Sequence, residues 1–437
     1  MNFLNKYSVL NYIFCFIPFA FALGNSAINL NIFLIIIIGF FLFKQKLIFI
    51  DKNPINISLI LFFFITIISS FLNYFDLQRF SFIDAESKKN FFKSILYFRF
   101  FLVFVVLVEL IKIEKFNIAY FYVSAAIVSF FLCIDIIYQA YFSVDLFGYV
   151  VNPSSHRLSG FFGDEYIAGG YLQKFSLFLI FFFPFIKIKT NYLKILYFFF
   201  FLFICFITLV LTNNRMPMVL FCLSFFFLSF FFNKLKKITI VSAITMLITL
   251  SLFIKFNERT YNFFNNYIFQ IKQISQVFIE RDKIKEGQIL IKSDYARLFN
   301  SSLDLSNKNK IFGLGIKSFR KNCFNNLTIN NLNKSCNNHP HNYYFEIIIS
   351  TGYVGLIIFV YILFISIKNF LKNYKKYNYY NLNNKLIITI PFVIFLVEMF
   401  PIRSSGGFFT TYNSAYIFIL IAIVNYLAIN NIKNLKN

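Results

Sequence analysis

The feature that most constrains the fold of this chain is a series of twelve apolar runs, each long enough or nearly long enough to cross a bilayer as a helix. The runs lie at about residues 8–24, 27–43, 55–73, 94–111, 117–140, 167–186, 193–212, 216–233, 238–255, 344–367, 386–402 and 408–429. Hydrophobic residues make up 59% of the chain and charged residues 14%, so a soluble fold could not bury the apolar surface. We therefore predict an all-α, polytopic membrane protein with about 12 transmembrane helices. The first run is alternatively a cleaved signal peptide, since Lys6 precedes it and Ala20-Phe21-Ala22 resembles a cleavage site.

Lysine residues set the predicted orientation. They cluster in alternate loops, including those at about residues 44–52, 187–194, 234–237 and 368–385. By the positive-inside rule, these loops and both termini face the cytoplasm. The formal net charge of +24 then reflects topology and attraction to anionic membrane lipid. The sequence has no basic module interleaved with aromatic residues and no zinc-finger spacing, so we expect no nucleic-acid partner.

Arginine is distributed differently, because none of the nine arginines lies in a predicted cytoplasmic loop. Arg99, Arg215 and Arg403 lie at or within membrane edges, where an ionised side chain is costly and usually functional. The remaining six lie in predicted outer loops or at their edges: Arg79, Arg157, Arg259, Arg281, Arg297 and Arg320. Guanidinium binds phosphate through a planar fork that an ammonium group lacks. The distribution therefore indicates a phosphate-bearing ligand on the outer side, with ordinary solvated charges as the alternative for Arg259 and Arg281.

A long outer loop, residues 256–343, separates the ninth and tenth runs. We predict that residues 1–437 form a single membrane domain that contains this loop. Residues 261–284 have apolar side chains at helical spacing, which predicts an interfacial helix. A second short helix and a glycine turn at Gly313 and Gly315 are expected to follow.

The cysteines and histidines of this loop indicate a disulfide and a site of proton transfer. Cys323 and Cys336 lie thirteen positions apart, and an oxidising compartment would let them form a disulfide. His339 and His341 follow at the mouth of a hydrophobic helix, where an imidazole is suited to proton transfer near neutral pH. Zinc bound by Cys336, His339 and His341 is the alternative. No fourth cysteine or histidine is close, so we expect no metal.

Ionisable residues within the apolar runs gather at one depth. Successive predicted spans cross the membrane in opposite directions, so the position of a residue within its span gives its depth. On this basis Arg99, Asp135, Arg215 and Glu398 lie near the outer leaflet, on the same side as the histidines. This clustering indicates a polar cavity that opens outward. A transporter would place such groups near the midplane and show related halves, and neither feature is visible. Arginines that hold a diphosphate and a histidine that accepts a proton fit glycosyl or phosphoryl transfer from a lipid diphosphate, without a metal or other cofactor.

Four motifs resemble those of bacterial O-antigen ligases and related lipid-linked-glycan polymerases. They are RLSGFFGDEYIAGGYL at 157–172, LTNNRMPMVL at 211–220, DYARLFNSSLDLSNKNKIFGLGIKSFR at 294–320 and HPHNYYFEIIISTGYVGLI at 339–357. The resemblance extends over the chain from about residue 94 and includes the large loop between the ninth and tenth spans. It implies a GT-C-like membrane glycosyltransferase in the bacterial inner membrane, with its large loop and active site in the periplasm.

The resemblance also implies roles for individual residues. Arg215 and Arg297 match arginines that grip the diphosphate of the polyprenyl carrier. His341 matches the histidine that activates the acceptor hydroxyl. From their spacing, we expect Asn342 and Glu346 to orient its imidazole. Further candidates for substrate binding are Arg99, His156, Arg157, Arg320, His339 and Arg403.

The implied reaction is metal-independent, inverting transfer of a glycan from a polyprenyl-diphosphate carrier to a lipid A-core hydroxyl. The main alternative is a polymerase whose acceptor is a second lipid-linked repeat unit, since both activities use the same donor. A transferase acting on protein Ser or Thr side chains is a further alternative. A flippase, which would need a cavity reaching the cytoplasm, is the alternative from a different class.

Overall fold

The fold is almost entirely helical in the computed structural model, which describes residues 6–47, 50–151, 157–186, 188, 190–232, 236–256, 258–325, 332–374, 382–404 and 406–427. The α-helices are α1 (Lys6–Cys15), α2 (Ile17–Leu23), α3 (Asn25–Phe43), α4 (Pro54–Tyr74), α5 (Ala85–Tyr97), α6 (Arg99–Lys112), α7 (Ile118–Phe142), α8 (Ala168–Ile180), α9 (Asn191–Leu211), α10 (Arg215–Phe231), α11 (Lys236–Phe256), α12 (Glu258–Ile279), α13 (Arg281–Lys285), α14 (Asp294–Ser306), α15 (Phe319–Phe324), α16 (Tyr343–Tyr374), α17 (Leu382–Glu398) and α18 (Thr411–Ala422). Two short strands, β1 (Phe75–Asp76) and β2 (Ser81–Phe82), pair antiparallel between α4 and α5. Short 3-10 or π segments lie at Lys44–Leu47, Gly160–Phe162, Phe183–Phe185 and Ile423–Leu427.

Polar residues at the helix starts explain why several helices begin where they do. The Asn53 side chain accepts from the Asn56 N–H at the start of α4, where Pro54 takes the first helical position. Ser293 caps α14 and Thr410 caps α18 in the same way. Each side chain satisfies an N–H that has no partner within its helix, which would be costly near lipid.

Within the described residues, each of the twelve predicted apolar runs is largely helical, although the runs at 8–24 and 94–111 are each divided between two helices. Among the described residues, eight segments are long and apolar enough to cross a membrane: Asn25–Phe43, Pro54–Tyr74, Ala85–Lys112, Ile118–Phe142, Ala168–Phe185, Asn191–Leu211, Lys236–Phe256 and Tyr343–Tyr374. Arg215–Phe231 and Thr411–Leu427 are shorter apolar helices. The chain is therefore a multi-pass membrane protein, while the total of twelve spans and the single-domain organisation stay predictions.

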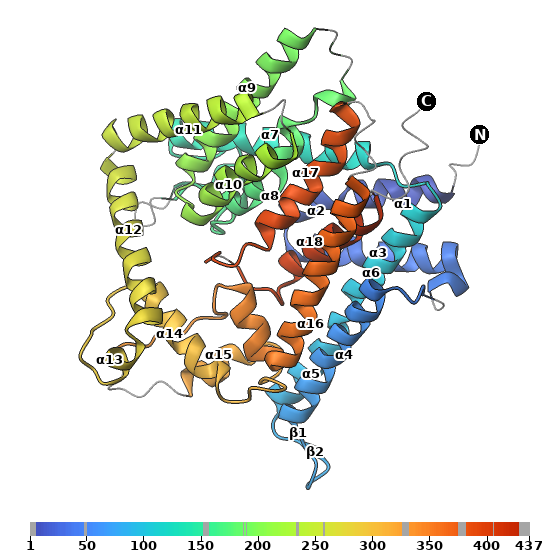
Figure 1. Cartoon of the computed structure of the whole chain (residues 1–437), viewed down its shortest axis with the longest axis vertical. Helices are drawn as coiled ribbons and strands as arrows, with labels where there is room; N and C mark the ends of the chain where they lie inside the picture. The colour runs from blue at the N-terminus through green and yellow to red at the C-terminus, as the bar shows by residue number, and fades with distance from the viewer. Residues whose placement is uncertain are drawn as a thin grey trace.

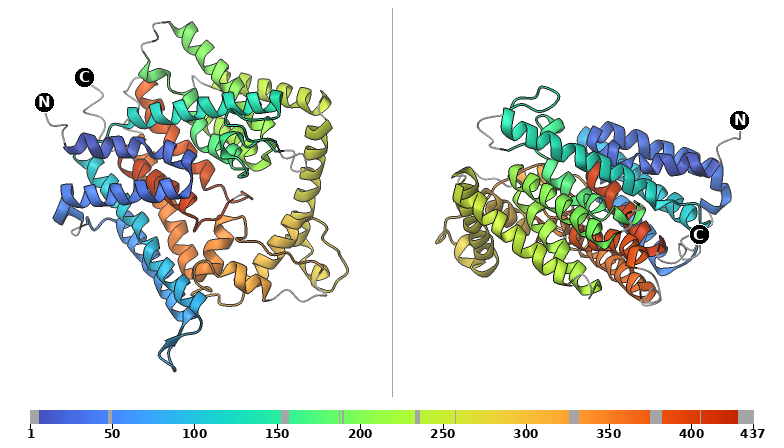
Figure 2. Two further views of the ribbon diagram at one scale, coloured as in Figure 1. Left: turned by 180° about the vertical axis from the view of Figure 1, so that it is seen from behind. Right: turned by 90° about the horizontal axis from the view of Figure 1, so that it is seen from above.

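The helices pack around one apolar core, with α4 against α16, α7 against α8 and α6 against α18. Many large apolar side chains remain on the outside, including Phe41, Leu247 and Ile357. Such exposure suits helices that face lipid rather than water. Figure 1 shows α12 running along one side of the molecule, from α11 at one end to the α13–α15 segment at the other. Figure 2 shows the same arrangement from behind and from above.

A break in α16 docks the segment that precedes α15. Gly352 interrupts the helix with φ 67° and ψ −169°, so the carbonyls of Ile349 and Ser350 accept from the N–H groups of Leu314 and Gly315. A Cβ on Gly352 would lie 2.1 Å from the carbonyl oxygen of Ile311, so only glycine fits. The interruption thereby fixes the loop of residues 310–315 to the helix that follows the two histidines.

Candidate active site

The backbone at His341 is held in a left-handed conformation, with φ 56°, at the residue before the N-cap of α16. Asn342 is that N-cap, since its Oδ1 accepts from the N–H groups of Tyr344 (2.9 Å) and Phe345 (3.1 Å). Its Nδ2 donates to the carbonyls of Pro401 (2.8 Å) and Arg403 (3.0 Å). Asn342 therefore joins the start of α16 to the loop after α17, and the conformation of His341 follows from that junction.

The imidazole of His341 lies among polar and aromatic neighbours. Its ring centroid is 4.2 Å from that of His339, with the rings at 82°, and 5.7 Å from that of Tyr295 on α14. Its Nε2 lies 3.1 Å from the Nδ2 of Asn337. An amide nitrogen can only donate, so Nε2 accepts this hydrogen bond. Burial, together with the neighbouring His339, lowers the pKa of His341 to about 4, so the ring is neutral at pH 7 and its Nε2 is unprotonated.

His339 lies between this ring and the loop that precedes α18. A Cβ on Gly407 would lie 2.5 Å from Cδ2 of His339 and 2.9 Å from Oε2 of Glu346, so glycine allows both side chains to approach the backbone. Glu346 Oε2 accepts the N–H of Phe408. The Nδ1 of His339 is buried and has no hydrogen-bond partner among the described residues. The histidine pair is thus seated against the 401–410 loop.

Arg215 is the first residue of α10, and its side chain contacts α12. Its Nη1 donates to Oε1 of Gln270 at 2.8 Å, and its guanidinium lies 5.9 Å from the ring centroid of Tyr267. Arg157 and Tyr295 both lie within electrostatic range of Arg215. Tyr295 is therefore near both the guanidinium of Arg215 and the ring of His341. The pattern places two cations and a neutral base around one region, which suits a substrate with a negative leaving group.

An apolar cavity of about 550 Å³ adjoins this region. Its lining comes from α10, α12, α14, the first half of α16 and the loop after α17, and includes Met216, Tyr267, Phe278, Asn342, Phe345 and Ile402. Met216 follows Arg215, and Asn342 follows His341. Apolar walls beside a cationic region suit a ligand with a lipid part and an anionic part.

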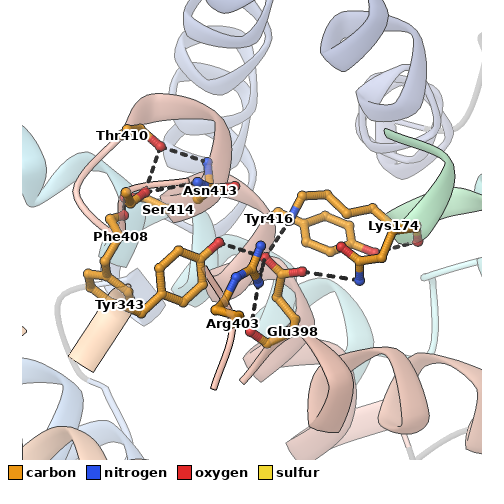
Figure 3. Close-up of polar contacts among 11 residues, drawn as sticks. Lys174, Tyr343, Glu398, Arg403, Phe408, Thr410, Asn413, Ser414 and Tyr416 are labelled. Carbon is orange, nitrogen blue, oxygen red and sulfur yellow. Dashed lines mark hydrogen bonds and ion pairs between the residues drawn. The ribbon is translucent and has the colours of Figure 1, made fainter. Parts of the chain in front are cut away.

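A buried ion network supports the loop to which Asn342 binds (Figure 3). Glu398, fully buried at the end of α17, accepts from Lys174 of α8, from Arg403 Nη1 at 2.9 Å and from the hydroxyl of Tyr343 at 2.7 Å. The guanidinium of Arg403 also lies 4.2 Å from the Tyr343 ring centroid and donates to the backbone carbonyl of Glu398 at 2.8 Å. Lys174 is covered by the ring of Tyr416, 4.6 Å away. Two cations therefore share one carboxylate, and the network ties α8, α16 and α17 together.

Comparison with known protein families identifies the segment that carries the site. Residues 200–360 match the family model described as O-Antigen ligase. This segment is similar to the O-antigen ligase family. The matched segment includes Arg215, Arg297 and His341, and the resemblance predicted from the motifs is confirmed. No curated protein matches the chain. The family supports a glycan ligase or polymerase type of function.

In this O-antigen ligase-like structure, Arg215, His339 and His341 gather around one region, with Arg157 within electrostatic range. Arg297 lies on α14, forms an ion pair with Asp294 and has a buried Nε without a hydrogen-bond partner among the described residues. No hydrogen bond or ion pair of the described residues joins it to the histidines. Its role at the diphosphate stays a prediction.

Among the described residues, the other predicted substrate residues show no contact with the histidines. Arg320 is exposed on α15, and Arg99 donates to Thr411 Oγ1 at 3.3 Å. Arg403 is engaged in the buried network rather than presented to a ligand. His156 lies outside the described residues.

The predicted orientation of the imidazole by Asn342 and Glu346 differs from the observed contacts. Asn342 holds the backbone on either side of the site, Glu346 binds the Phe408 N–H, and Asn337 contacts the ring of His341. Spacing along α16 could not reveal the contacts of Asn342 and Glu346, because their partners come from a loop some sixty residues further on. Asn342 and Glu346 thus support the site through the backbone.

Cys323 and Cys336 form a disulfide, with a Cα–Cα distance of 5.7 Å. Cys336 is therefore not a thiolate ligand, which removes the proposed zinc set of Cys336, His339 and His341. No group of three or more His, Cys, Asp or Glu side chains that could hold a metal occurs among the residues that the structure describes.

Sequence reasoning missed three contributors: Tyr295, Gln270 and Lys174. Lys174 had a detectable signal, since it is a charged residue inside the apolar run 167–186. Tyr295 and Gln270 had none, because tyrosine and glutamine are ordinary residues in a loop helix. Only the packing of α12 and α14 against α10 and α16 brings them to the site.

Proposed function

We propose that this protein is an inverting glycosyltransferase of the O-antigen ligase type. It moves a glycan from a polyprenyl-diphosphate carrier to a hydroxyl of a lipid A-core acceptor at the periplasmic face of the bacterial inner membrane. The observation that carries the proposal is the neutral imidazole of His341 facing the same region as Arg215, beside an apolar cavity.

The donor side of the proposal rests on charge and on apolar surface. Arg215 and Arg157 lie within electrostatic range of each other, and such like charges are stabilised together by an anion such as a diphosphate. Arg297 is the further arginine proposed to reach the diphosphate. The adjoining cavity suits the isoprenoid units next to the diphosphate.

The acceptor side rests on His341. The acceptor hydroxyl takes the place of the Asn337 amide at Nε2, and Asn337 is exposed, so it can move aside. The hydroxyl proton passes to Nε2 as the oxygen attacks the anomeric carbon. The bond between that carbon and the diphosphate oxygen breaks, and the carrier diphosphate leaves with the electron pair. Arg215 stabilises the negative charge that develops on this oxygen. A single displacement inverts the anomeric centre.

Replacing His341 by Asn tests the base role with little disturbance of the backbone. Asparagine tolerates the left-handed conformation at φ 56° better than alanine does. We expect the rate of glycan transfer to fall by about 10²–10⁴-fold, the usual contribution of a general base. Lys317→Asn is the matched control, because Lys317 also has a positive φ of 60° and lies outside the site. Retained transfer in His341→Asn, at normal protein levels in the membrane, would contradict the proposal.

The acceptor is tested with purified protein and a polyprenyl-diphosphate-linked glycan, with and without lipid A-core. Glycan on lipid A-core together with released carrier diphosphate supports a ligase. Lengthening of the carrier-linked glycan without that acceptor identifies the polymerase alternative. Arg215→Lys should impair either activity severely, because a single ammonium cannot reproduce the two-pronged grip of a guanidinium.

A further inference from the structure

Helix α12 is attached to the rest of the molecule at few points. Among its described side chains only Gln273 and Val277 are buried. Gln273 accepts the N–H groups of Lys292 and Ser293, and Val277 packs in a small cluster with Ile284. Both of these buried side chains of α12 therefore contact the α13–α14 segment. The helix before it, α11, has the smallest buried share of the eight candidate spans, at 17%.

One polar attachment of α12 to the membrane helices is the hydrogen bond between Gln270 and Arg215. Tyr267 and Gln270 lie one turn apart on the face that meets Arg215. Further along α12, Ile274 and Phe278 line the cavity of about 550 Å³ together with Phe345 at the start of α16. Phe278 stacks on Phe345, with ring centroids 6.4 Å apart.

The Gln270 amide is a weak substitute for a phosphate oxygen. Its Oε1 is a neutral acceptor that occupies Nη1 of Arg215 at 2.8 Å. The bond to Gln270 has a charge on the donor only, whereas a doubly charged diphosphate places charge on both partners and binds the guanidinium through paired hydrogen bonds, so it binds more strongly. A ligand with a single delocalised charge gains less binding free energy when it replaces the Gln270 amide on Arg215. Phospholipid headgroups, with a single phosphodiester charge, greatly outnumber any diphosphate carrier in a membrane.

We propose that Gln270 is a specificity-determining residue that occupies the diphosphate position of Arg215 and excludes phospholipid headgroups until a diphosphate donor displaces it. The inference rests on the proposed function, because it takes Arg215 as the diphosphate grip. Donor binding transfers Arg215 from the amide to the diphosphate.

The test measures donor KM and kcat with purified full-length protein in nanodiscs of rising phosphatidylglycerol content. Gln270→Met keeps the length of the side chain and removes the acceptor. We expect its donor KM to rise several-fold with phosphatidylglycerol while kcat stays near that of the wild type, whose KM changes little. Gln276→Met, the same substitution six positions along α12, is the matched control. An identical response of Gln270→Met and wild type to phosphatidylglycerol would overturn the inference.

A second measurement separates this inference from the proposed function. Binding of polyprenyl diphosphate without a glycan is followed by native mass spectrometry. Gln270→Glu places a carboxylate on Arg215, and we expect the affinity to fall roughly tenfold or more. If Gln270→Glu loses affinity for polyprenyl diphosphate and the wild type transfers no glycan, the proposed transferase function would be refuted while the role of Gln270 would be supported. Unchanged affinity in Gln270→Glu, or no binding to the wild type, would overturn the role of Gln270.

Discussion

The buried network around Glu398 predicts an asymmetry between two substitutions. Glu398 is fully buried and serves Lys174 and Arg403, whose side chains are 2% and 4% exposed. Glu398→Gln removes the only negative charge of this network and leaves two cations close together in a medium of low polarity. Lys174→Met removes the surplus cation and leaves one arginine paired with one carboxylate. The two variants therefore have opposite effects on the charge balance, although each breaks the same ion pair.

The structure sets the expected magnitudes. Removing one partner of a buried ion pair typically costs about 3–5 kcal/mol of folding free energy, and Glu398→Gln also weakens the bond from the Tyr343 hydroxyl. We expect the cost of Glu398→Gln to lie at the upper end of that range. Lys174→Met exchanges a buried ammonium for an apolar side chain of similar length, and we expect a cost below about 1.5 kcal/mol.

The cysteines of the chain supply the assay. Cys133 and Cys205 are fully buried, so a thiol-reactive fluorophore labels them only as the protein unfolds during heating in detergent. Glu398→Gln should unfold at a clearly lower temperature than wild type, and Lys174→Met close to it. Lys272→Met on the exposed face of α12 controls for the substitution itself. Equal destabilisation by Lys174→Met and Glu398→Gln would refute the argument from shared charge.

Two further predictions concern the histidine site and the break in α16. Since the pKa of His341 is lowered from 6.5 to about 4, its contribution to stability is present above pH 6.5 and is lost as the pH falls toward 4. A bound diphosphate favours the imidazolium and therefore raises the pKa of His341 in the donor complex. The acid limb of the kcat profile should then lie at higher pH than the acid limb of the kcat/KM profile for the donor. Acid limbs at the same pH would argue against a diphosphate near His341. Gly352→Ala should destabilise the protein by several kcal/mol and slow transfer, because its Cβ would meet the backbone of the 310–315 loop. Gly287 also has a positive φ but has open space around it, so Gly287→Ala should lower the free energy of unfolding by only about 1–2 kcal/mol. Equal unfolding midpoints for Gly352→Ala and Gly287→Ala in the thermal assay would contradict the steric argument.

The helical segments could be predicted from the sequence because their signals are local. The run at 117–140 became α7, and the periodic apolar residues after position 261 became α12. Where the sequence suggested one continuous helix, the structure sometimes has a break. The run at 94–111 is divided at Phe98, and α16 is interrupted at Gly352. The second break depends on a loop that supplies replacement hydrogen bonds, so it could not be inferred from the helix alone.

The candidate site was only partly predictable. His341 and Arg215 are conspicuous in the sequence because imidazole and guanidinium are costly beside a bilayer. Their surroundings are not conspicuous, since Gln270 and Tyr295 have no distinctive sequence pattern. Arg403 illustrates the opposite case. It was predicted to bind substrate from its place at a membrane edge, and the structure buries it beside Glu398.

The class of protein and the approximate positions of its helices follow from the sequence, because the length of an apolar run and the residues at its ends act over short distances along the chain. Which polar groups meet depends on the tertiary packing. Lys174 and Glu398 lie 224 positions apart, and Asn342 and Arg403 lie 61 apart. In an apolar interior each such group must find a partner wherever packing brings one, and packing depends on the whole set of helices at once.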